Sequence, residues 1–417
     1  MDIVNYEHVP IKRIGKVITG KTPATSHEEY YGGQYMFISP VELHGGYRVT
    51  KSEKTITEKG LESIKTNSIE GISILVGCIG WDMGNVAMCF EKCATNQQIN
   101  AITQIDAKYN PYYIYYWLCG KKKYLFSIAS VTRTPILSKS TFEEIVIPLP
   151  IKKNQDKIAN ILLKIDQKIT LNKQINDNLE QQLMLLYDYW FIQFDFPDND
   201  GNPYQTSGGK MVWNDTLKRN IPENWKVQSV ISNCLSSIIK PGVEIFNTKT
   251  YLATADVKGT SISTGTIVDY DGRESRANMQ PSINSVWFAK MKNSIKHLYL
   301  NKEMQPIISS SILSTGFCGL QCNEISFEYI ASYVSNAYFE IHKDMLAHGA
   351  TQEAVNNDDL AGVHIIIPEA IVLRAYHEAT QAIYAQISKN ICENQELVKL
   401  RDWLLPMLMN GQATISD

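Results

Sequence analysis

Apolar side chains recur at alternating steps of four and three residues through the stretch 155–191. This heptad spacing predicts a long helix that packs along its length against another helix. At ~1.5 Å per residue, the span from Ile158 to Trp190 corresponds to a rod of roughly 48 Å. The seam positions are Ile158, Leu162, Ile165, Ile169, Asn172, Asn176, Leu179, Leu183, Leu186 and Trp190.

The same pattern returns 218 residues further along the chain. Thr380 and Arg401 interrupt this second apolar seam without removing it. An apolar segment with proline precedes each copy, IPLPIKKN in the first and VHIIIPEA in the second. The segment LLPMLMNGQ is expected to end the second helix through its Pro and Gly. The second set of positions is Tyr376, Thr380, Ile383, Ile387, Asn390, Asn394, Leu397, Arg401 and Leu404.

Two asparagines stand in each copy at positions where a heptad seam is normally apolar. Two helices in one chain can pack parallel or antiparallel. An antiparallel pair centred on Gln174 places Asn172 near Asn394 and Asn176 near Asn390. Buried asparagines cost stability but fix the register, because any slip leaves an amide unpaired. They could instead face solvent at a local irregularity, but their repetition at one offset favours the register role.

Each long helix follows a stretch of about 150 residues with mixed strand and helix patterns. Strands are expected at QYMFIS, ISILVGCI and NVAMCF in the first stretch, and at YLATADV, SVWFAKM and PIISSSIL in the second. A late helical segment follows in each, NPYYIYYWLCGKKKYLF and FEYIASYVSNAYFEIHKDML. The order of parts repeats although the residues differ, so we expect one scaffold with two different working surfaces.

The predicted fold class is therefore α+β, with two mixed α/β domains separated by an antiparallel coiled coil of two long helices. The internal repeat is expected to be pseudo-two-fold. The expected divisions are 1–150 for the first mixed domain, 151–195 for the first long spacer helix, 196–221 for a linker rich in Asp, Asn, Gly and Pro, 222–368 for the second mixed domain, 369–410 for the second long spacer helix and 411–417 for a tail.

Composition narrows the classes of partner. The 417 residues carry a formal net charge of −3, and the eight cysteines show no even framework spacing. No apolar run approaches the length of a membrane span, so we expect a soluble, cytoplasmic protein with reduced thiols and no membrane contact. The charge balance argues against a chain that grips nucleic acid alone, because phosphate contacts usually require a basic surface. Any nucleic-acid role is expected to be shared with a partner.

A rod with an approximate two-fold axis at its middle would place two domains at its opposite ends. B-DNA presents two-fold-related edges, and one face of a groove recurs every ~34–36 Å. Two unlike domains on a rigid spacer would suit a split target whose halves differ in sequence, with the rod setting the gap.

The residues of the first long helix and of the segment that follows it resemble those of a known family. The run NQDKIANILLKIDQKITLNKQINDNLEQQLMLLYDYWFIQFDFPDNDGNPYQTSGGKM closely resembles the central region of the specificity (S) subunit of type I restriction-modification enzymes. TRTPILSKSTFEEIVIPLP and LRDWLLPMLMNGQ resemble the end of that family's first target-recognition domain and the end of its distal helix. The resemblance covers nearly the whole chain, and the domains before each helix match mainly at their edges.

The resemblance implies a non-catalytic subunit that reads double-stranded DNA through two target-recognition domains. It also implies that two methylation (M) subunits dock on the helices and that two restriction or motor (R) subunits can complete the complex. The sequence leaves open whether R subunits accompany this chain. No cofactor is expected in the chain itself, since S-adenosylmethionine, ATP and Mg²⁺ would belong to the partner subunits.

Residues that could read base edges were sought among Arg, Lys, Asn, Gln and hydroxyl side chains on loops. Most such residues in any protein are solvated or cap turns, so the two sets carry more weight than any member alone. The basic run at residues 121–123 is a minority candidate for phosphate contact. The first domain offers Lys21, Thr22, Thr25, Trp81, Asn85, Asn96, Gln97, Gln98, Thr132 and Arg133, and the second offers Arg273, Arg276, Asn278, Thr315 and Gln352.

Two other classes of protein are alternatives to a DNA-recognition subunit. A self-contained DNA adenine methyltransferase requires a Gly-rich cofactor loop, and no G-x-G-x-x-G is present. NPYY is one letter from an adenine-binding motif, but Asn110 and Pro111 fit the N-cap and first turn of a helix. The C-x3-C pairs at Cys89/Cys93 and Cys318/Cys322 fit buried apolar positions better than zinc ligands. A coiled-coil scaffold without DNA contact is the remaining alternative, and it predicts no DNA binding even with a methylase partner present.

Overall fold

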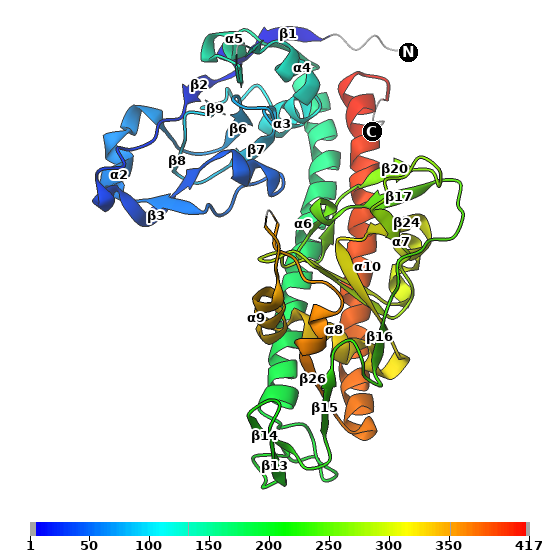
Figure 1. Ribbon diagram of the computed structural model, residues 1–417. Helices are drawn as coiled ribbons and strands as arrows, with labels where there is room; N and C mark the ends of the chain where they lie inside the picture. The colour runs from blue at the N-terminus through cyan, green and yellow to red at the C-terminus, as the bar shows by residue number, and fades with distance from the viewer. Residues whose placement is uncertain (1–5, 132, 351, 414–417) are drawn as a thin grey trace. The chain divides into compact units, whose positions relative to one another are not determined.

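The computed structural model describes residues 6–131, 133–350 and 352–413. The chain divides into two compact units (Figure 1). The first unit contains residues 1–170 and 397–417, and the second unit contains residues 171–396. Both long helices cross this division, so each unit contains one part of each helix.

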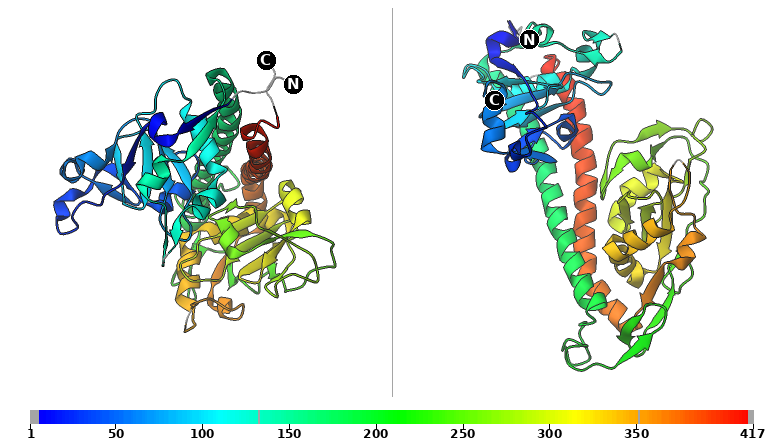
Figure 2. Two further views of the ribbon diagram at one scale, coloured as in Figure 1. Left: turned by 90° about the horizontal axis from the view of Figure 1, so that it is seen from above. Right: turned by 60° about the vertical axis from the view of Figure 1, so that its left-hand side comes forward.

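The first long helix, α6, spans Lys152–Tyr187 and continues into a short π-helical turn, η4 (Asp188–Ile192). The second, α10, spans Ala370–Met409. α10 ends at Met409, inside the segment LLPMLMNGQ that is expected to end it, although Pro406 itself lies within the helix. Gly411 follows with a φ of +68°, a conformation that favours glycine. The two helices lie side by side in Figure 1 and in the right-hand view of Figure 2.

Within the second unit the two helices run in opposite directions and meet through asparagines. Asn390 donates to Asn176 at 2.8 Å, and Asn172 donates to Asn394 at 3.0 Å. Asn172, Asn176 and Asn390 are all buried. Asn176 also donates to the main-chain carbonyl of Ile387 at 3.3 Å, so its amide is bonded on both sides. These are the amide pairs that an antiparallel arrangement centred on Gln174 requires.

The two irregular positions of the second seam are both satisfied by hydrogen bonds. Thr380 is buried, and its hydroxyl donates to the carbonyl of Tyr376 one turn earlier at 2.6 Å. Within the first unit, Arg401 donates to the buried carboxylate of Asp166 on α6 at 2.9 Å. Tyr116 donates to the other oxygen of Asp166 at 2.7 Å. Arg401 is therefore an ion-pair partner of α6 and not a break in the packing.

The first unit is built around an antiparallel sheet in the order β2-β9-β6-β7 and a mixed sheet in the order β4-β3-β8-β5 (Figure 1). β3 and β8 are the parallel pair. The strands are β1 (Glu7–Pro10), β2 (Lys16–Thr19), β3 (Tyr31–Ile38), β4 (Lys54–Ile56), β5 (Ser68–Ile69), β6 (Ser73–Gly77), β7 (Val86–Cys89), β8 (Cys93–Thr95), β9 (Ile99–Thr103), β10 (Ser130–Val131), β11 (Pro135–Ile136) and β12 (Val146–Leu149). The helices are α1 (Ile11–Ile14), α2 (Glu58–Ser63), α3 (Pro111–Cys119), α4 (Lys122–Ser127) and α5 (Lys139–Glu143), with short turns η1 (Glu28–Tyr30), η2 (Pro40–His44) and η3 (Lys65–Asn67).

The second unit repeats this plan with an antiparallel sheet β16-β25-β22-β23 and a mixed sheet β20-β17-β24-β21. β17 and β24 form its parallel pair. The strands are β13 (Met211–Asn214), β14 (Arg219–Pro222), β15 (Lys226–Ser229), β16 (Ser236–Ile238), β17 (Lys249–Leu252), β18 (Val257–Lys258), β19 (Ser261–Ile262), β20 (Thr266–Val268), β21 (Ala277–Met279), β22 (Ser285–Ala289), β23 (His297–Leu300), β24 (Ser311–Ser314), β25 (Phe317–Cys322) and β26 (His364–Ile367). The helices are α7 (Gln305–Ser310), α8 (Phe327–Ser335) and α9 (Ala337–Leu346), with short turns η5 (Thr254–Asp256), η6 (Lys302–Met304), η7 (Glu324–Ser326) and η8 (Asp359–Gly362).

The strands of the two main sheets correspond in chain order and in pairing. β1 pairs with β12 in the first unit as β15 pairs with β26 in the second. The central strands β6 and β22 are buried along their whole length, because both faces of each sheet are covered. The repeat of topology is therefore much closer than the repeat of sequence.

Two segments differ from expectation. The first part of PIISSSIL is helix α7, and only its end forms strand β24. The segment 196–221 contains the hairpin strand β13 and most of β14, so it is more than a linker. It is also anchored by the ring of Phe196, which stacks on Trp225 with ring centroids 4.9 Å apart. Local Asp, Asn, Gly and Pro content favours turns, but it does not show whether the turns connect paired strands.

Candidate nucleic-acid interface

The first unit gathers its loops at one end of the sheet β2-β9-β6-β7. In the antiparallel register Gly77 pairs with Ile99, and Thr19 pairs with Asn100. The loop after β2, the loop before β9 and the turn between β6 and β7 must therefore emerge together. We call this end, with residues 20–25, 78–85, 96–98 and 130–137, the first loop edge.

Side chains from two of these loops contact one another. Thr22 donates to the side-chain carbonyl of Gln97 at 2.8 Å, which holds the exposed Gln97 amide in place. Asn96 donates to Gln98 at 3.0 Å. Gly20 permits the close approach of the loops, because a Cβ there would lie 2.1 Å from the carbonyl oxygen of Asn96. Lys21 follows Gly20 directly and is exposed.

Main-chain hydrogen bonds attach the turn 78–85 and the segment 130–137 to this group. The amide of Cys78 donates to the carbonyl of Gln98 at 2.7 Å. The amide of Leu137 donates to Cys78 at 2.8 Å, and Gly80 donates to Pro135 at 3.0 Å. Arg133 is exposed in the segment so attached. Thr132 lies outside the described residues.

The turn 78–85 presents an aromatic ring and an ion-pair cluster. Trp81 is 71% exposed, an unusual state for a large apolar side chain. Lys122 of α4 donates to Asp82 at 2.6 Å and to Asn85 at 2.8 Å. The hydrogen bond from Lys122 lowers the pKa of Asp82, so this carboxylate stays charged. His44 lies 3.0 Å from the same carboxylate. Asn85 is thus engaged in holding the turn.

The second unit repeats the same main-chain bonds with different residues. The main-chain amide of Lys290 donates to the carbonyl of Gly316 at 2.9 Å, and the amide of Val355 donates to the carbonyl of Lys290 at 3.0 Å. The main-chain amide of Lys292 donates to the carbonyl of Glu353 at 3.0 Å. They correspond to the bonds of Cys78, Leu137 and Gly80 in the first unit. We call this end, with residues 273–278, 290–296, 314–316 and 352–355, the second loop edge.

Of the five predicted residues of the second unit, Arg276, Thr315 and Gln352 lie at this edge with exposed or partly exposed side chains. The amide of Thr315 donates to the carbonyl of Arg276 at 2.8 Å, which brings these two residues together. Arg276 and Gln352 are exposed. Arg273 instead lies over the ring of Tyr270, 3.9 Å from its centroid, and donates to the Tyr270 carbonyl. Arg273 is therefore committed to its own loop.

Sequence reasoning missed the lysines of the second loop edge. Lys290, Lys292 and Lys296 occur in the run KMKNSIK and lie on the turn between β22 and β23. Lys292 pairs with Glu353 at 2.8 Å, and Lys296 donates to the carbonyl of Thr254 at 2.5 Å. The alternating lysines were the available signal, since a strand end followed by spaced basic residues is typical of a phosphate-facing turn.

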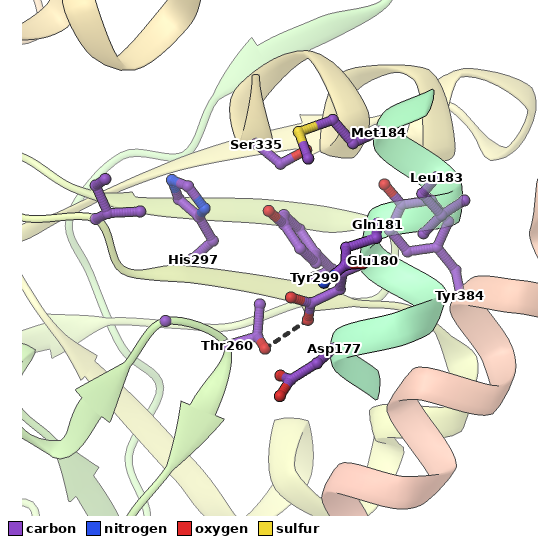
Figure 3. Close-up of a pocket in the computed structure, with 12 residues that line it drawn as sticks. Asp177, Glu180, Gln181, Leu183, Met184, Thr260, His297, Tyr299, Ser335 and Tyr384 are labelled. Atoms are coloured by element: carbon purple, nitrogen blue, oxygen red, sulfur yellow. Dashed lines mark hydrogen bonds between the residues drawn. The ribbon is translucent and has the colours of Figure 1, made fainter. Parts of the chain in front are cut away.

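A cavity of about 370 Å³ lies between α6 and the sheets of the second unit (Figure 3). Asp177, Glu180 and Met184 of α6 line one side, and His297 and Tyr299 lie across from them. Thr260 donates to Glu180 at 2.7 Å. Burial raises the pKa of Glu180 and this hydrogen bond offsets part of the rise. The residues that line this cavity form polar contacts between α6 and the strands of the second unit.

Groups that would suggest catalysis have structural roles. Asn110 caps α3 by accepting from the amides of Tyr112 and Tyr113, with Pro111 at the first helical position, as the sequence predicts. Cys89 and Cys93 are buried with sulfurs 3.5 Å apart, and burial raises the pKa of Cys78 to about 12. Among the described residues, no group of three or more His, Cys, Asp or Glu is placed to hold a metal ion. No helix in the described ranges is long and apolar enough to cross a membrane.

Comparisons with known proteins give relatives of similar sequence and fold. The family model of the type I restriction modification DNA specificity domain matches residues 3–181. The MjaIX type I restriction enzyme specificity subunit of Methanocaldococcus jannaschii is 27% identical over 98% of this chain and 93% of its own length. The HindI type I restriction enzyme specificity subunit of Haemophilus influenzae is 31% identical over 41% of this chain and 39% of its own. The crystal structure of the S subunit of a type I restriction-modification system from M. genitalium has the same fold, with a TM-score of 0.53 at 15% identity over 98% of this chain and 97% of that one.

Proposed function

We propose that this chain is a type I restriction-modification specificity subunit, which reads the two halves of a split DNA target with its two units. Its similarity to the family model and to a full-length relative supports the proposal. One observation carries the proposal: matching main-chain hydrogen bonds gather matching loops in both units, while the side chains exposed there differ. A constant scaffold with variable loops suits two half-sites of unlike sequence. The chain is a recognition subunit and not an enzyme.

The first loop edge supplies Lys21, Thr22, Gln97 and Arg133 for the first half-site. Gln can bond adenine through two atoms, Arg can do the same with guanine, and Lys reaches guanine or phosphate. Trp81, exposed at the same edge, offers a flat apolar face for contact with the groove or backbone. Asn96 and Gln98 flank Gln97 and support its loop.

The second loop edge supplies Arg276, Thr315 and Gln352 for the second half-site. The lysines at 290, 292 and 296 add positive charge for phosphates. The corresponding turn of the first unit carries Asp82 instead. The two edges therefore combine base-reading and phosphate-binding groups in different proportions.

The long helices α6 and α10 act as the spacer between the half-sites and as the docking surface for two methylation subunits. Asn172, Asn176, Asn390 and Asn394 hold the register of the helix pair, because a slip would bury unpaired amides. Double-stranded DNA is the ligand that this chain binds. S-adenosylmethionine, with ATP and Mg²⁺ where restriction subunits join, serves the partner subunits. The matching strand order of the two units supports a pseudo-two-fold internal repeat as part of this proposal.

The test is to coexpress the chain with its methylation subunit and to map modified adenines. We expect a two-part motif with a fixed gap. Replacing residues 1–140 by the corresponding part of another family member should change one half of the motif completely and leave the other half and the gap intact. Replacing 222–368 is the matched control and should change the opposite half.

A change of both halves by either exchange would contradict the division of labour. Absence of sequence-selective methylation by the unaltered complex would instead favour a scaffold without DNA contact.

A further inference from the structure

Lys343 on α9 is a charged side chain with no exposure to solvent. Its ammonium group has three N–H donors, and the structure provides three hydrogen-bond acceptors. These are Glu340 at 2.6 Å, the carbonyl of Ala289 at 3.3 Å and the carbonyl of Ser294 at 3.4 Å. Ala289 is the last residue of β22, and Ser294 lies in the turn between β22 and β23. Lys343 therefore joins the end of β22 to this turn.

Neighbouring groups strengthen the same attachment. The amide of Asn293 donates to Asp344 at 3.1 Å. Asn293 has a φ of +56°, a left-handed conformation that costs energy for a residue with a side chain. Asp344 thus holds the turn at its strained residue, next to the carbonyl that Lys343 binds.

The charge of Lys343 is balanced inside the protein. Glu340 accepts from Lys343 and lies 2.8 Å from the buried His297, which also lines the cavity in Figure 3. Burial alone would raise the pKa of Glu340, but the hydrogen bonds from His297 and Lys343 outweigh it and hold the pKa below the ordinary value. The carboxylate of Glu340 therefore stays ionised at neutral pH.

A buried ion pair of this kind adds little net stability compared with well-packed apolar residues. Its distinctive effect is geometric, because an ammonium bonded to two carbonyls allows only one arrangement of the chain that carries them. The turn so fixed is 290–296, which carries the partly exposed Lys290, Lys292 and Lys296 of the second loop edge.

We propose that Lys343 and Asp344 are positioning residues for the second half-site, because they set the conformation in which the turn 290–296 meets DNA. This inference rests on the proposed function for its DNA part. The attachment of the turn itself is a property of the free chain and can be measured without DNA. Neither residue is expected to touch a base.

The first measurement is hydrogen exchange of the turn 290–296 in the full-length protein. Lys343→Met should raise exchange at these amides by about tenfold or more, because the turn then opens locally at low cost. Asp344→Ala removes the bond to Asn293 and the 3.6 Å ion-pair contact with Lys343, but it leaves the bonds from Lys343 to Glu340 and to the two carbonyls. It should raise exchange mainly at Asn293, so it keeps the inference testable if Lys343→Met folds poorly. Lys302→Met, which removes an exposed lysine of the same unit, is the charge-matched control and should change nothing in the turn.

The second measurement is base selection by the complex with the methylation subunit. Both variants should reduce the penalty for a mismatched base pair in the second half-site by about tenfold, a large part of what one mismatch normally costs. The first half-site should keep its selectivity, which a general loss of stability would not allow.

Unchanged exchange in the turn, or equal loss of selection in both half-sites, would overturn the positioning role. Failure of the unaltered complex to select any sequence would overturn the proposed function, and the exchange result would still decide whether Lys343 holds the turn.

Discussion

The turns 78–85 and 290–296 occupy the same place in the two units but are held differently. In the first unit Lys122 and Asp82 form the support at the surface, with side chains 45% and 65% exposed. In the second unit the lysine of the support has no exposure and is bonded to main-chain carbonyls. Equivalent positions in one scaffold can thus be fixed by weak, solvent-screened contacts or by a buried network.

The physical consequence is a difference in stiffness. An exposed ion pair contributes ~0.2–1 kcal/mol and weakens with salt. Breaking a buried pair by removing one partner costs ~3–5 kcal/mol, because a charge is left without compensation. We therefore expect the first turn to adapt to DNA more readily than the second.

The largest effect should come from changing the spacer while leaving both units intact. One heptad of seven residues inserted in each helix, beside Gln174 and the facing position Cys392, keeps the apolar seam in phase. Seven residues add roughly 10 Å at ~1.5 Å per residue. At ~3.4 Å per base pair along B-DNA, the gap between the half-sites should grow by about three base pairs. The modified adenines can be mapped by sequencing.

The comparison variant has four residues, about half a heptad, inserted beside Gln174 in α6 alone, which puts the apolar seam out of phase with α10. It should abolish methylation, because it displaces Asn172 and Asn176 from their partners on α10. A motif unchanged by either insertion would show that the helices do not set the gap.

The second-largest effect should be on base selection, because substitutions at each loop edge should change selection in only one half-site. Gln97→Ala together with Arg133→Ala should relax the first half-site by ~1–3 kcal/mol for each true bidentate contact. Arg276→Ala should act on the second half-site alone. Binding of oligonucleotides with single base changes in each half measures both. Intact selection at the first half-site would remove Gln97 and Arg133 from the reading set.

The heptad pattern made much of the helix pair predictable. Steps of four and three residues specify a helix face, and two polar residues repeated at one offset specify which residues can meet. The hydrogen bond between Asn176 and Asn390 follows from that geometry. The pattern could not show that Arg401 finds a carboxylate, because Asp166 lies outside the apolar seam. Nor could it show that Pro406 lies inside α10.

The loop edges were predictable only in part. Residues such as Gln97 and Arg133 were recognisable as loop residues of suitable chemistry. Their gathering depends on strand register, which short strand patterns do not specify. The commitment of Asn85 to Asp82 and of Arg273 to Tyr270 depends on turn conformation. The buried Lys343 was not a candidate, since lysines on helices are usually exposed.

A smaller effect should appear in the stability of the helix pair itself. Asn390→Leu leaves the buried amide of Asn176 without its main partner and should lower the free energy of unfolding by ~1–3 kcal/mol. Denaturant unfolding measures the change. The double variant Asn176→Leu with Asn390→Leu is the control and should recover most of the loss, because both polar groups are then removed together. Equal loss in both variants would show that packing, and not the amide pair, sets the effect.

The smallest effect should come from the exposed support of the first turn. Lys122→Met removes the hydrogen bonds to Asp82 and Asn85, but these groups can turn to water, so the expected cost is ~0.2–1 kcal/mol. Hydrogen exchange of the turn 78–85 should rise only slightly, and high salt should produce much of the same rise in the unaltered protein. The turn 290–296 should respond less to salt in the same experiment, because Lys343 of α9, which holds this turn, is shielded from solvent. A large, salt-independent response at the first turn would mean that both turns are held with similar stiffness, and the contrast between the two units would then lie only in their exposed side chains.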